Sequence, residues 1–424
     1  MPTKSNNNAN TDIVVDSENQ DRAGFFEALS NSSLQRFVSA TLLWGTGHQL
    51  ITLSQGYLLF EMTASTLWLA ALGAAVAIPN VIVGVIGGVL ADRVPQTRLL
   101  KFGAVVAGIP MLMIAILYVS GTLAAWHIVL AGMFQGAGLA VDWISRLSLL
   151  PDVVPRNILI RSISLDQSVF NGARVLGPVV GGLLLGVTGP GPTYAVIAGL
   201  FGLTYLVYTT FNPTKQTLIA RSVGVLSDLK EVIQVIRERP ILRVNLMFTW
   251  VNAMVLGGLV FMLPAFAKQV FLTDESGLGF LFASVGTGAV LGAITVSWTG
   301  GIQRAGLALL LTDLMFGGLI VIWAHSNGMP IALSLAFLIG YFNSVHVAFG
   351  IAVIQFNVPA EVRGRVIGAY EIAWSGFPMG GLASGSLAAF FGLSNALIVL
   401  AGSLIVFTIF IALVSDKFRQ SKIE

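Results

Sequence analysis

The sequence predicts an all-α membrane protein with twelve transmembrane helices in two six-helix halves. Three observations lead to this fold class. Of the 424 residues, 55% are hydrophobic and only 10% are charged, whereas an ordinary soluble domain carries about 25% charged residues. The chain divides into twelve apolar runs, and a run of about 20 residues is long enough to cross a bilayer. The positive charges lie almost entirely on one side of that arrangement.

Each apolar run ends at a charge cluster or at a turn of Gly, Pro or Asn residues. Such residues punctuate helices, so they mark the ends of the spans. The predicted spans are residues 37–60, 67–90, 99–119, 127–149, 160–187, 193–211, 244–270, 277–298, 305–324, 330–353, 365–388 and 394–415.

Polar segments divide the chain further. The Asn-rich N-terminal segment lacks the charged-then-apolar order of a signal peptide, so we expect an uncleaved, disordered tail. The longest polar connection separates six spans from six. The predicted organisation is a cytoplasmic tail at 1–33, an N-terminal half at 34–211, a linker at 212–243, a C-terminal half at 244–415 and a cytoplasmic tail at 416–424.

The linker contains the sequence DLKEVIQVIRERP, which predicts a short amphipathic helix. Asp228 and Glu231 have the spacing of a capping box, and an apolar stripe follows them. Basic residues occupy the other face, so this helix can lie on the anionic inner leaflet. A solvated linker helix is the alternative.

The distribution of Lys and Arg predicts the topology. With the N-terminus in the cytoplasm, 21 of the 23 Lys and Arg residues fall on the cytoplasmic side, and the exceptions are Arg174 and Lys268. Cytoplasmic loops carry this excess in membrane proteins. We therefore expect a monomeric, multi-pass protein of the cell (inner, plasma) membrane that contacts the lipid bilayer and has both termini in the cytoplasm.

An internal repeat relates the two halves. The segment around Val154-Pro155 resembles the segment around Val358-Pro359 at an offset of 204 residues. Two copies of a six-span unit that read in the same direction are typical of transporters built from parallel repeats.

The connection between the second and third spans reads GGVLADRVPQTRLLK. Gly84 and Gly88 form a face of small residues, which lets two helices approach closely. Asp92 at the membrane edge can cap the N-terminus of another helix, and Arg93 and Arg98 can bind carboxylates or lipid phosphates. A generic positively charged loop is the alternative.

The fifth span contains the sequence NGARVLGPVVGG. Pro178 removes a backbone hydrogen bond and bends the helix, while Gly177, Gly181 and Gly182 permit tight packing against a neighbouring span. Arg174 lies within the same span, and we interpret it as a structural group. As a packing motif alone, this sequence needs no transport role.

Together with the repeat, the loop motif resembles the signature of the major facilitator superfamily. Gly88, Asp92 and Arg93 match it, whereas residues 95–97 depart from the glycine and basic pair of the family pattern. The resemblance implies the major facilitator fold and alternating access of the two halves. It also implies that Gly88, Asp92, Arg93 and Arg98 form a conformational latch, with Asp92 capping the start of span eleven.

The motif in the fifth span resembles that of the superfamily's antiporters, which implies export. From residue 34 onward the chain resembles twelve-span exporters that include macrolide-efflux and enterobactin-export proteins, through DLKEVIQVIRERPILR, LPAFAKQVF, VPAEVRGRV and FPMGG. Members of that branch often place an acid after the glycine in the middle of span one. Here His48 follows Gly47, so no carboxylate is available at that position.

Ionisable residues within the spans are candidates for proton coupling, because such groups are unfavourable in a membrane unless they face protein or water. Asp142 and Arg146 are spaced i, i+4 and can pair. Paired charges can stiffen helix contacts, or a buried carboxylate can take up and release a proton during the cycle. The proton-coupling candidates are Asp142, Glu371, Asp166 and His48.

In this family spans one, four, seven and ten line the central cavity, and here they carry uncharged polar and aromatic side chains. Such walls suit a bulky amphipathic ligand better than a small, highly charged metabolite. Each aromatic side chain taken alone can equally be packing. The substrate-cavity candidates are Gln49, Gln135, Arg146, Trp250, Asn252, Tyr341, Asn343 and His346.

These features predict a secondary active transporter, namely a proton-coupled exporter of a small amphipathic compound such as a drug, macrolide or siderophore. An uptake symporter or facilitator of the same fold is the first alternative, and a non-transporting membrane scaffold is the second. The chain has no Cys, only four scattered His residues and no GxxxxGKS or GxxxxGKT phosphate loop. We therefore expect a small-molecule substrate and protons as ligands, but no enzyme activity, cofactor, metal or nucleic-acid partner.

Overall fold

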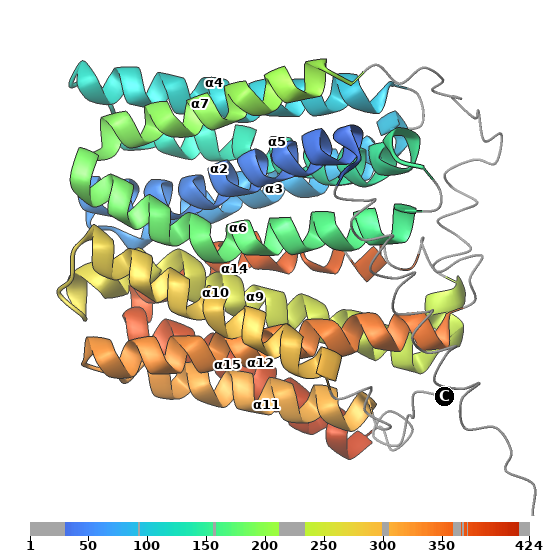
Figure 1. Ribbon diagram of the computed structural model, residues 1–424. Coiled ribbons are helices and arrows are strands. Elements are labelled where there is room, and N and C mark those ends of the chain that lie inside the picture. The colour runs from blue at the N-terminus through green and yellow to red at the C-terminus, as the bar shows by residue number, and fades with distance from the viewer. Residues whose placement is uncertain are drawn as a thin grey trace, which may run out of the picture.

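The computed structural model describes residues 30–91, 94–155, 158–211, 234–298, 305–358, 366, 369–370 and 372–414. These residues form twelve long helices (Figure 1), ten of which are long and apolar enough to cross a membrane. The helices are α2 (Ser32–Thr63), α3 (Thr66–Ala91), α4 (Gln96–Val119), α5 (Ala125–Val153), α6 (Leu159–Thr188), α7 (Pro190–Thr209), α9 (Pro240–Gln269), α10 (Glu275–Trp298), α11 (Ala305–Trp323), α12 (Met329–Asn357), α14 (Gly376–Phe391) and α15 (Leu393–Val414).

Every predicted span has its helix, which confirms the all-α membrane fold class. The largest difference is in span eleven, whose predicted start was residue 365 whereas α14 begins at Gly376. Trp374 and Ser375 form a turn there. Pro378 agrees with this break, because a proline ring clashes with the carbonyl four residues earlier, here that of Trp374. Such a clash either ends a helix or bends it, and Pro178 lies inside the continuous helix α6.

The helices form two bundles that lie side by side (Figure 1). Helices α2 to α7 pack on one another, as do helices α9 to α15. The bundles meet where α6 packs against α10 and where α3 packs against α14. Helices α2 and α9 also contact each other, so they are the inner helices of their bundles. This is the arrangement of two six-helix halves that the repeat predicts.

The two ends of the molecule are distinct (Figure 1). The end at which α2 begins and α15 ends is called the terminal end. The opposite end, which carries the short connections α2–α3, α4–α5, α6–α7, α9–α10, α11–α12 and α14–α15, is called the loop end.

The two tightest loop-end turns are equivalent in the two halves. Gly189 joins α6 to α7 with φ 77°, and Gly392 joins α14 to α15 with φ 85°. This region of backbone conformation is open to glycine but strained for most other residues. The repeat is therefore visible in backbone geometry as well as in sequence.

The outer surface of the bundles is apolar. Large hydrophobic side chains such as Val119, Phe390 and Leu413 are almost fully exposed. Such a surface would be unfavourable in water, whereas a helix facing lipid satisfies its backbone internally and loses nothing by exposing apolar side chains. The exposed apolar surface therefore agrees with a protein whose helices cross a bilayer.

Candidate functional site

One face of α2 is exposed at the terminal end and becomes buried toward the loop end. Gln35, Ser39 and Leu42 are exposed, and Thr46 and Gln49 are half-buried. These five residues follow one another at helical spacing, so they form one stripe. Helix α2 packs against helices of both bundles, so we infer that this stripe faces the boundary between the two halves.

Helix α9 carries a matching stripe. Arg243, Met247 and Trp250 are exposed, and Met254 is half-buried. These residues also follow one another at helical spacing. Like α2, α9 packs against helices of both bundles. Of the predicted cavity residues, Gln49 lies on the α2 stripe and Trp250 lies on the α9 stripe.

The two stripes converge at the loop end. A Cβ atom added to Gly56 of α2 would lie 3.1 Å from Cγ of Pro264 of α9, so the absence of a side chain permits this approach. Both residues continue their stripes at helical spacing. We infer a central cavity between α2 and α9 that is open at the terminal end and closed at the loop end.

The two stripes have a mixed chemical character. Leu42, Met247 and Trp250 supply apolar and aromatic surface, while Gln49 supplies an amide that can donate and accept hydrogen bonds. Arg243, near the open end, is the one charged residue of the two stripes. A pocket of this kind favours an amphipathic ligand over a small, multiply charged one.

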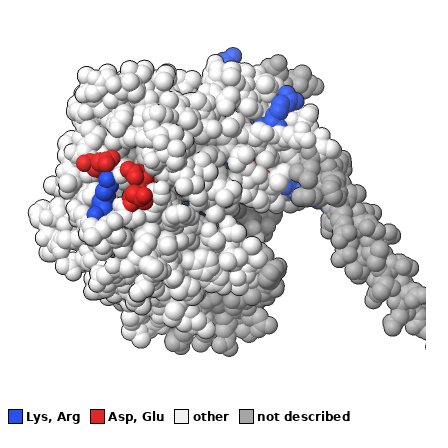
Figure 2. Space-filling model, turned by 60° about the vertical axis from the view of Figure 1, so that its left-hand side comes forward, with Lys and Arg blue, Asp and Glu red and all other residues white. Residues whose placement is uncertain are grey.

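Charged side chains hold the two bundles together at the loop end. Nζ of Lys268 on α9 lies 3.1 Å from Oε1 of Glu61 on α2 and 4.5 Å from the ring centre of Tyr57. The Tyr57 hydroxyl donates a hydrogen bond to the carboxylate of Glu275 on α10. We call Tyr57, Glu61, Lys268 and Glu275 the loop-end lock. Figure 2 shows acidic and basic side chains gathered in one group on this part of the surface.

The glycines of the motif in α6 lie at helix crossings. A Cβ atom on Gly177 would lie 2.7 Å from Cβ of Gln49, and one on Gly182 would lie 2.7 Å from Cα of Gly279 on α10. Gly181 likewise faces α2. The motif therefore packs α6 against the inner helix of its own half and, through Gly182, against the opposite half.

A buried charge cluster lies inside the N-terminal half. Nε of Arg146 lies 3.2 Å from Oδ2 of Asp142, and its Nη1 lies 2.5 Å from Oδ2 of Asp166. The Tyr208 hydroxyl donates to Oδ1 of Asp142 at 3.2 Å, and the Thr41 hydroxyl donates to Oδ1 of Asp166. We call Asp142, Arg146 and Asp166 the N-half charge cluster, and it links α2, α5, α6 and α7.

The N-half charge cluster is not electrically balanced. One guanidinium faces two carboxylates, and the three side chains are at most 2% exposed. The guanidinium also lies over the rings of Trp143 and Phe170, at 5.4 and 4.9 Å, which is within the range of a cation–π interaction. A guanidinium stays protonated in proteins, so one proton on a carboxylate would make the cluster neutral.

A second buried polar group lies inside the C-terminal half. Asn252, Asn343 and His346 come together there with Asp313 of α11, and each is at most 5% exposed. Asn252, Asn343 and His346 are predicted cavity residues, but in this conformation their side chains face the interior of their own bundle. Gln135 and Arg146 are buried in the same way in the N-terminal half. A ligand entering the cavity would therefore not meet these five side chains first.

The remaining predicted residues differ in how far they are buried. Tyr341 on α12 is half-buried. His48 on α2 is half-buried, and Arg174 on α6 is exposed. Pro178 lies inside α6, as predicted. Arg98 is exposed in the first turn of α4.

Part of the predicted latch lies outside the described residues. Asp92 and Arg93 are in that part, and so are Arg365 and the coupling candidate Glu371. Gly88 lies in the last turns of α3. The latch therefore stays a prediction.

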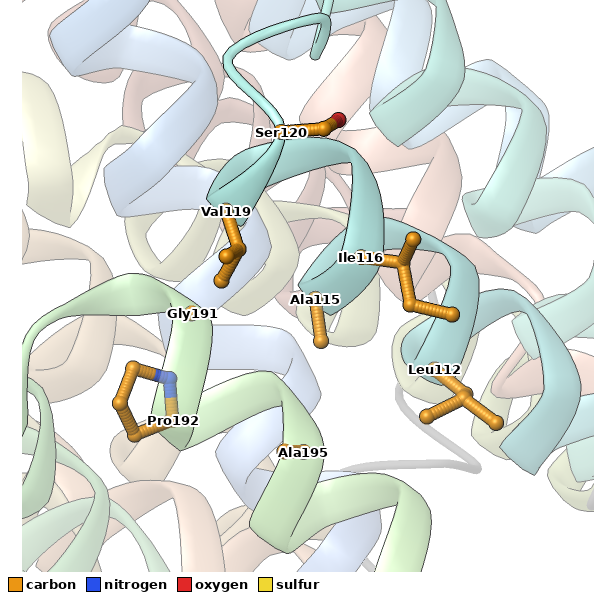
Figure 3. A pocket seen from close by; sticks show the side chains of 8 residues that line it. All are labelled: Leu112, Ala115, Ile116, Val119, Ser120, Gly191, Pro192 and Ala195. Atoms are coloured by element: carbon orange, nitrogen blue, oxygen red, sulfur yellow. The ribbon is translucent and has the colours of Figure 1, made fainter.

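A shallow hollow at the loop end is unrelated to the cavity. It lies between α4 and α7 and is lined by Leu112, Ile116, Val119 and Pro192 together with smaller residues (Figure 3). Its lining carries no ionisable side chain, and several of its residues belong to the exposed apolar surface. Nothing in its chemistry marks it as a site for a polar or amphipathic ligand.

Comparison with known protein families decides the assignment. The family model described as Major Facilitator Superfamily matches residues 36–377. The chain belongs to the major facilitator superfamily. Its family, its apolar helices and its relatives make it a multi-pass membrane transporter.

Several relatives are named as transporters. The chain is 25% identical to the uncharacterized MFS-type transporter YfiS of Bacillus subtilis, covering 86% of this chain and 88% of the relative. It is 22% identical to the multidrug efflux pump Tap of Mycolicibacterium fortuitum, covering 85% and 90%. It is 25% identical to the enterobactin exporter EntS of Shigella boydii, covering 72% and 73%. The predicted resemblance to an efflux and enterobactin-export branch is confirmed by these relatives.

Solved structures share the fold. A bacterial homologue of the human lysosomal transporter Spinster, in an inward-facing and occupied conformation, has a TM-score of 0.72 at 14% identity and covers 92% of this chain and 98% of its own. A D-xylose–proton symporter has a TM-score of 0.66 at 15% identity and covers 89% and 96%. At these identities the likeness concerns the fold alone.

Proposed function

We propose that this protein is a secondary active exporter that moves a small amphipathic compound out of the cytoplasm and is driven by protons entering the cell. The observation that carries the proposal is the uneven contact between the halves. Helices α2 and α9 approach closely at the loop end, where the loop-end lock joins the two bundles, and their stripes are exposed toward the terminal end. Such an arrangement is what alternating access requires. The relatives named as an efflux pump and as an exporter support the outward direction.

The orientation in the membrane follows from the charges. We infer that the terminal end faces the cytoplasm, because 21 of the 23 Lys and Arg residues belong to that side. The central cavity then opens toward the cytoplasm, and the loop-end lock faces outside. The membrane is the plasma membrane of the cell in this proposal.

The N-half charge cluster supports proton coupling. Without an added proton it carries one uncompensated negative charge in the bundle interior, which is unfavourable. A proton on Asp142 or Asp166 removes that charge. The cluster also joins four helices of one half, so its protonation can bias how that half packs. Glu371 and His48 remain further candidates for the coupling residue.

The chemistry of the cavity supports the substrate class. Its two walls combine an indole, thioethers and an amide, and the charged group on them, Arg243, is at the open end. An amphipathic compound can bury its apolar part against Met247 and Trp250 and keep its polar part near Gln49.

Accumulation assays test the proposal. Cells that express the protein should retain less of a fluorescent amphipathic compound than cells carrying an empty vector, and a protonophore should remove the difference. Asp142→Asn or Asp166→Asn should abolish the part of the efflux that depends on the proton gradient. Retention that rises with expression would reveal an importer and would refute the export proposal. Efflux that persists in the presence of the protonophore would refute proton coupling.

A further inference from the structure

The polar group in the C-terminal half is an isolated cluster in an apolar interior. Nδ2 of Asn252 donates to Oδ1 of Asp313 at 2.8 Å, and Nδ1 of His346 lies 3.0 Å from the same oxygen. Nδ2 of Asn343 donates to Oδ1 of Asn252 at 2.7 Å. The side chains of Asp313 and His346 are fully buried. Three helices, α9, α11 and α12, therefore meet at this cluster.

The hydrogen bonds point toward the carboxylate. Asn343 donates to Asn252, which in turn donates to Asp313, so the two amides polarise one another in one direction. This arrangement stabilises a negative charge on Asp313. Oδ2 of Asp313 and both ring nitrogens of His346 have no hydrogen-bond partner among the described residues, so the 3.0 Å approach of Nδ1 to Oδ1 is a close contact and not an aligned hydrogen bond. His346 is thus the group on which a proton would balance that charge.

The charge balance of the pair depends on one proton. With a proton on the imidazole, Asp313 and His346 form a neutral ion pair. Without it, one negative charge stays in an apolar bundle, which is unfavourable unless another cation is near. Arg243 and Lys268 lie on α9 at roughly 13 and 24 Å along the helix from Asn252, on a rise of about 1.5 Å per residue. Neither can replace the proton.

The other ionisable groups around the pair do not supply a charge either. Helices α14 and α15 carry no charged residue. The ionisable groups of the described residues on the elements around the pair are Arg243, Lys268, Glu275, Tyr341 and Tyr370, together with Arg36, His48, Tyr57 and Glu61 on α2, which packs against α9. Arg36 lies in the first turns of α2 and donates to the carbonyl oxygen of Thr210 in the N-terminal half.

In the internal repeat this cluster is equivalent to the N-half charge cluster. His346 stands at the offset of 204 residues from Asp142, the same offset that relates Val154 to Val358. Both residues are buried, on α5 and α12 respectively, and each makes an ion pair inside its own half. Equivalent positions in the two halves therefore carry a titratable group that one proton brings to neutrality.

We propose that Asp313 and His346 form a second proton-binding site, in the C-terminal half, which holds one proton in the conformation with the loop end closed. The imidazole gains that proton and becomes imidazolium, and it returns to the neutral ring when the proton leaves to water. The role of the site in transport rests on the proposed function. The binding of the proton does not.

Histidine NMR tests the binding directly. The chain has only four His residues, so selective isotope labelling gives few signals, and His346→Gln identifies the signal of His346. At about pH 7.5 an ordinary imidazole is mostly neutral. We expect His346 to be an imidazolium at that pH in the wild-type protein. In Asp313→Asn, which keeps the shape of the side chain, we expect a neutral ring.

Two results would overturn the proposal. The first is a neutral His346 in the wild-type protein at that pH, which needs only the wild-type measurement if Asp313→Asn does not fold. The second is an imidazolium that persists in folded Asp313→Asn. Asn395→Asp, which places an acid on the exposed side of α15, is the matched control and should leave the His346 signal unchanged.

A transport measurement separates this proposal from the proposed function. In proteoliposomes Asp313→Asn and His346→Gln should lose gradient-driven transport of the fluorescent compound but keep its exchange across the membrane without a gradient. A wild-type protein that shows no gradient-driven transport would refute the proposed function, and the NMR result would still decide the proton site. Gradient-driven transport at the wild-type rate in both variants would refute the role of this site in coupling.

Discussion

Replacing Arg146 should destabilise the protein far more than replacing Asp142, because the two substitutions change the buried charge in opposite directions. The wild-type N-half charge cluster has one positive and two negative groups. Arg146→Gln leaves two unpaired carboxylates, whereas Asp142→Asn leaves one balanced pair. Breaking a buried ion pair by removing one partner costs about 3–5 kcal/mol.

The loss of stability caused by Asp142→Asn can be compared with that caused by Arg146→Gln from the contacts of Asp142. That variant loses one charge-assisted hydrogen bond, from Arg146 at 3.2 Å, which is worth about 1.5–3 kcal/mol. It also removes the uncompensated charge, and the Asn oxygen can still accept from Tyr208. We therefore expect a net change within about 1 kcal/mol, so the two variants should differ by roughly 2–4 kcal/mol.

The free energy of unfolding in mixed micelles, followed by circular dichroism during titration with SDS, measures this difference. Arg146→Lys is the matched control, because it keeps the charge but loses the two-armed geometry, and it should fall between the others. The triple variant with Asp142→Asn, Arg146→Gln and Asp166→Asn should recover much of the loss, since it leaves no buried charge. An Arg146→Gln protein as stable as Asp142→Asn would refute the reasoning.

Four further predictions concern the packing of the halves and the topology. Glu61→Lys should favour the conformation with an open loop end by up to about fivefold, since a half-exposed pair is worth about 0.2–1 kcal/mol, and adding Lys268→Glu should restore the wild-type balance in crosslinking assays. Gly182→Val should separate α6 from α10 and reduce transport, whereas wild-type transport by this variant would count against a close crossing. A reporter fused at Leu218 should be active only in the cytoplasm, and activity outside would contradict the topology. Asp92→Asn should express and fold normally but transport less, and full transport would remove the latch.

The helices could be predicted from the sequence because the signal is strong and local. Long apolar runs between charged turns give every span, and the spacing of Asp142 and Arg146 predicts their pairing. The turn before α14 was not predicted, although Pro378 carries the information. Its effect depends on whether the proline falls in the first turn of a helix or in the interior, and a span that is apolar throughout does not reveal this.

The contacts between the halves were beyond the sequence, because they join residues far apart in the chain. Glu61 and Lys268 are 207 residues apart, and no periodicity links them. One signal in the sequence could have pointed to the lock. Among the predicted connections on the non-cytoplasmic side, only those after the first and seventh spans carry acidic or basic residues, namely Glu61, Asp274 and Glu275. The stripes of α2 and α9 were also missed. Polar residues occur on several faces of α2, and α9 is largely apolar, so the sequence does not show which face of either helix opens to the cavity.

The burial of His346 and its neighbours illustrates a related limit. Polar residues in a cavity-lining span can face the cavity or the interior of their own half, and spacing alone does not distinguish the two. Asn343 and His346 lie on one face of α12, and only the position of Asp313 on α11 shows that this face points inward. The sequence therefore identifies the polar groups but not their partners.

Distances between spin labels test whether the central cavity opens alternately at its two ends. The chain has no Cys, so cysteine pairs can be added to the natural sequence. Ser39 and Met247 mark the open end of the cavity, and Met62 and Gln269 mark the closed loop end; all four are exposed. A pair at Met62 and Val119, within one half, is the control.

Double electron–electron resonance on the protein in lipid nanodiscs, at low and neutral pH and with a transported compound, gives the three distances. We expect a second population in which the Met62–Gln269 distance is longer and the Ser39–Met247 distance is shorter, while the Met62–Val119 distance stays constant. The share of this population should change with pH. Distances that stay the same at both ends under all conditions would contradict alternating access.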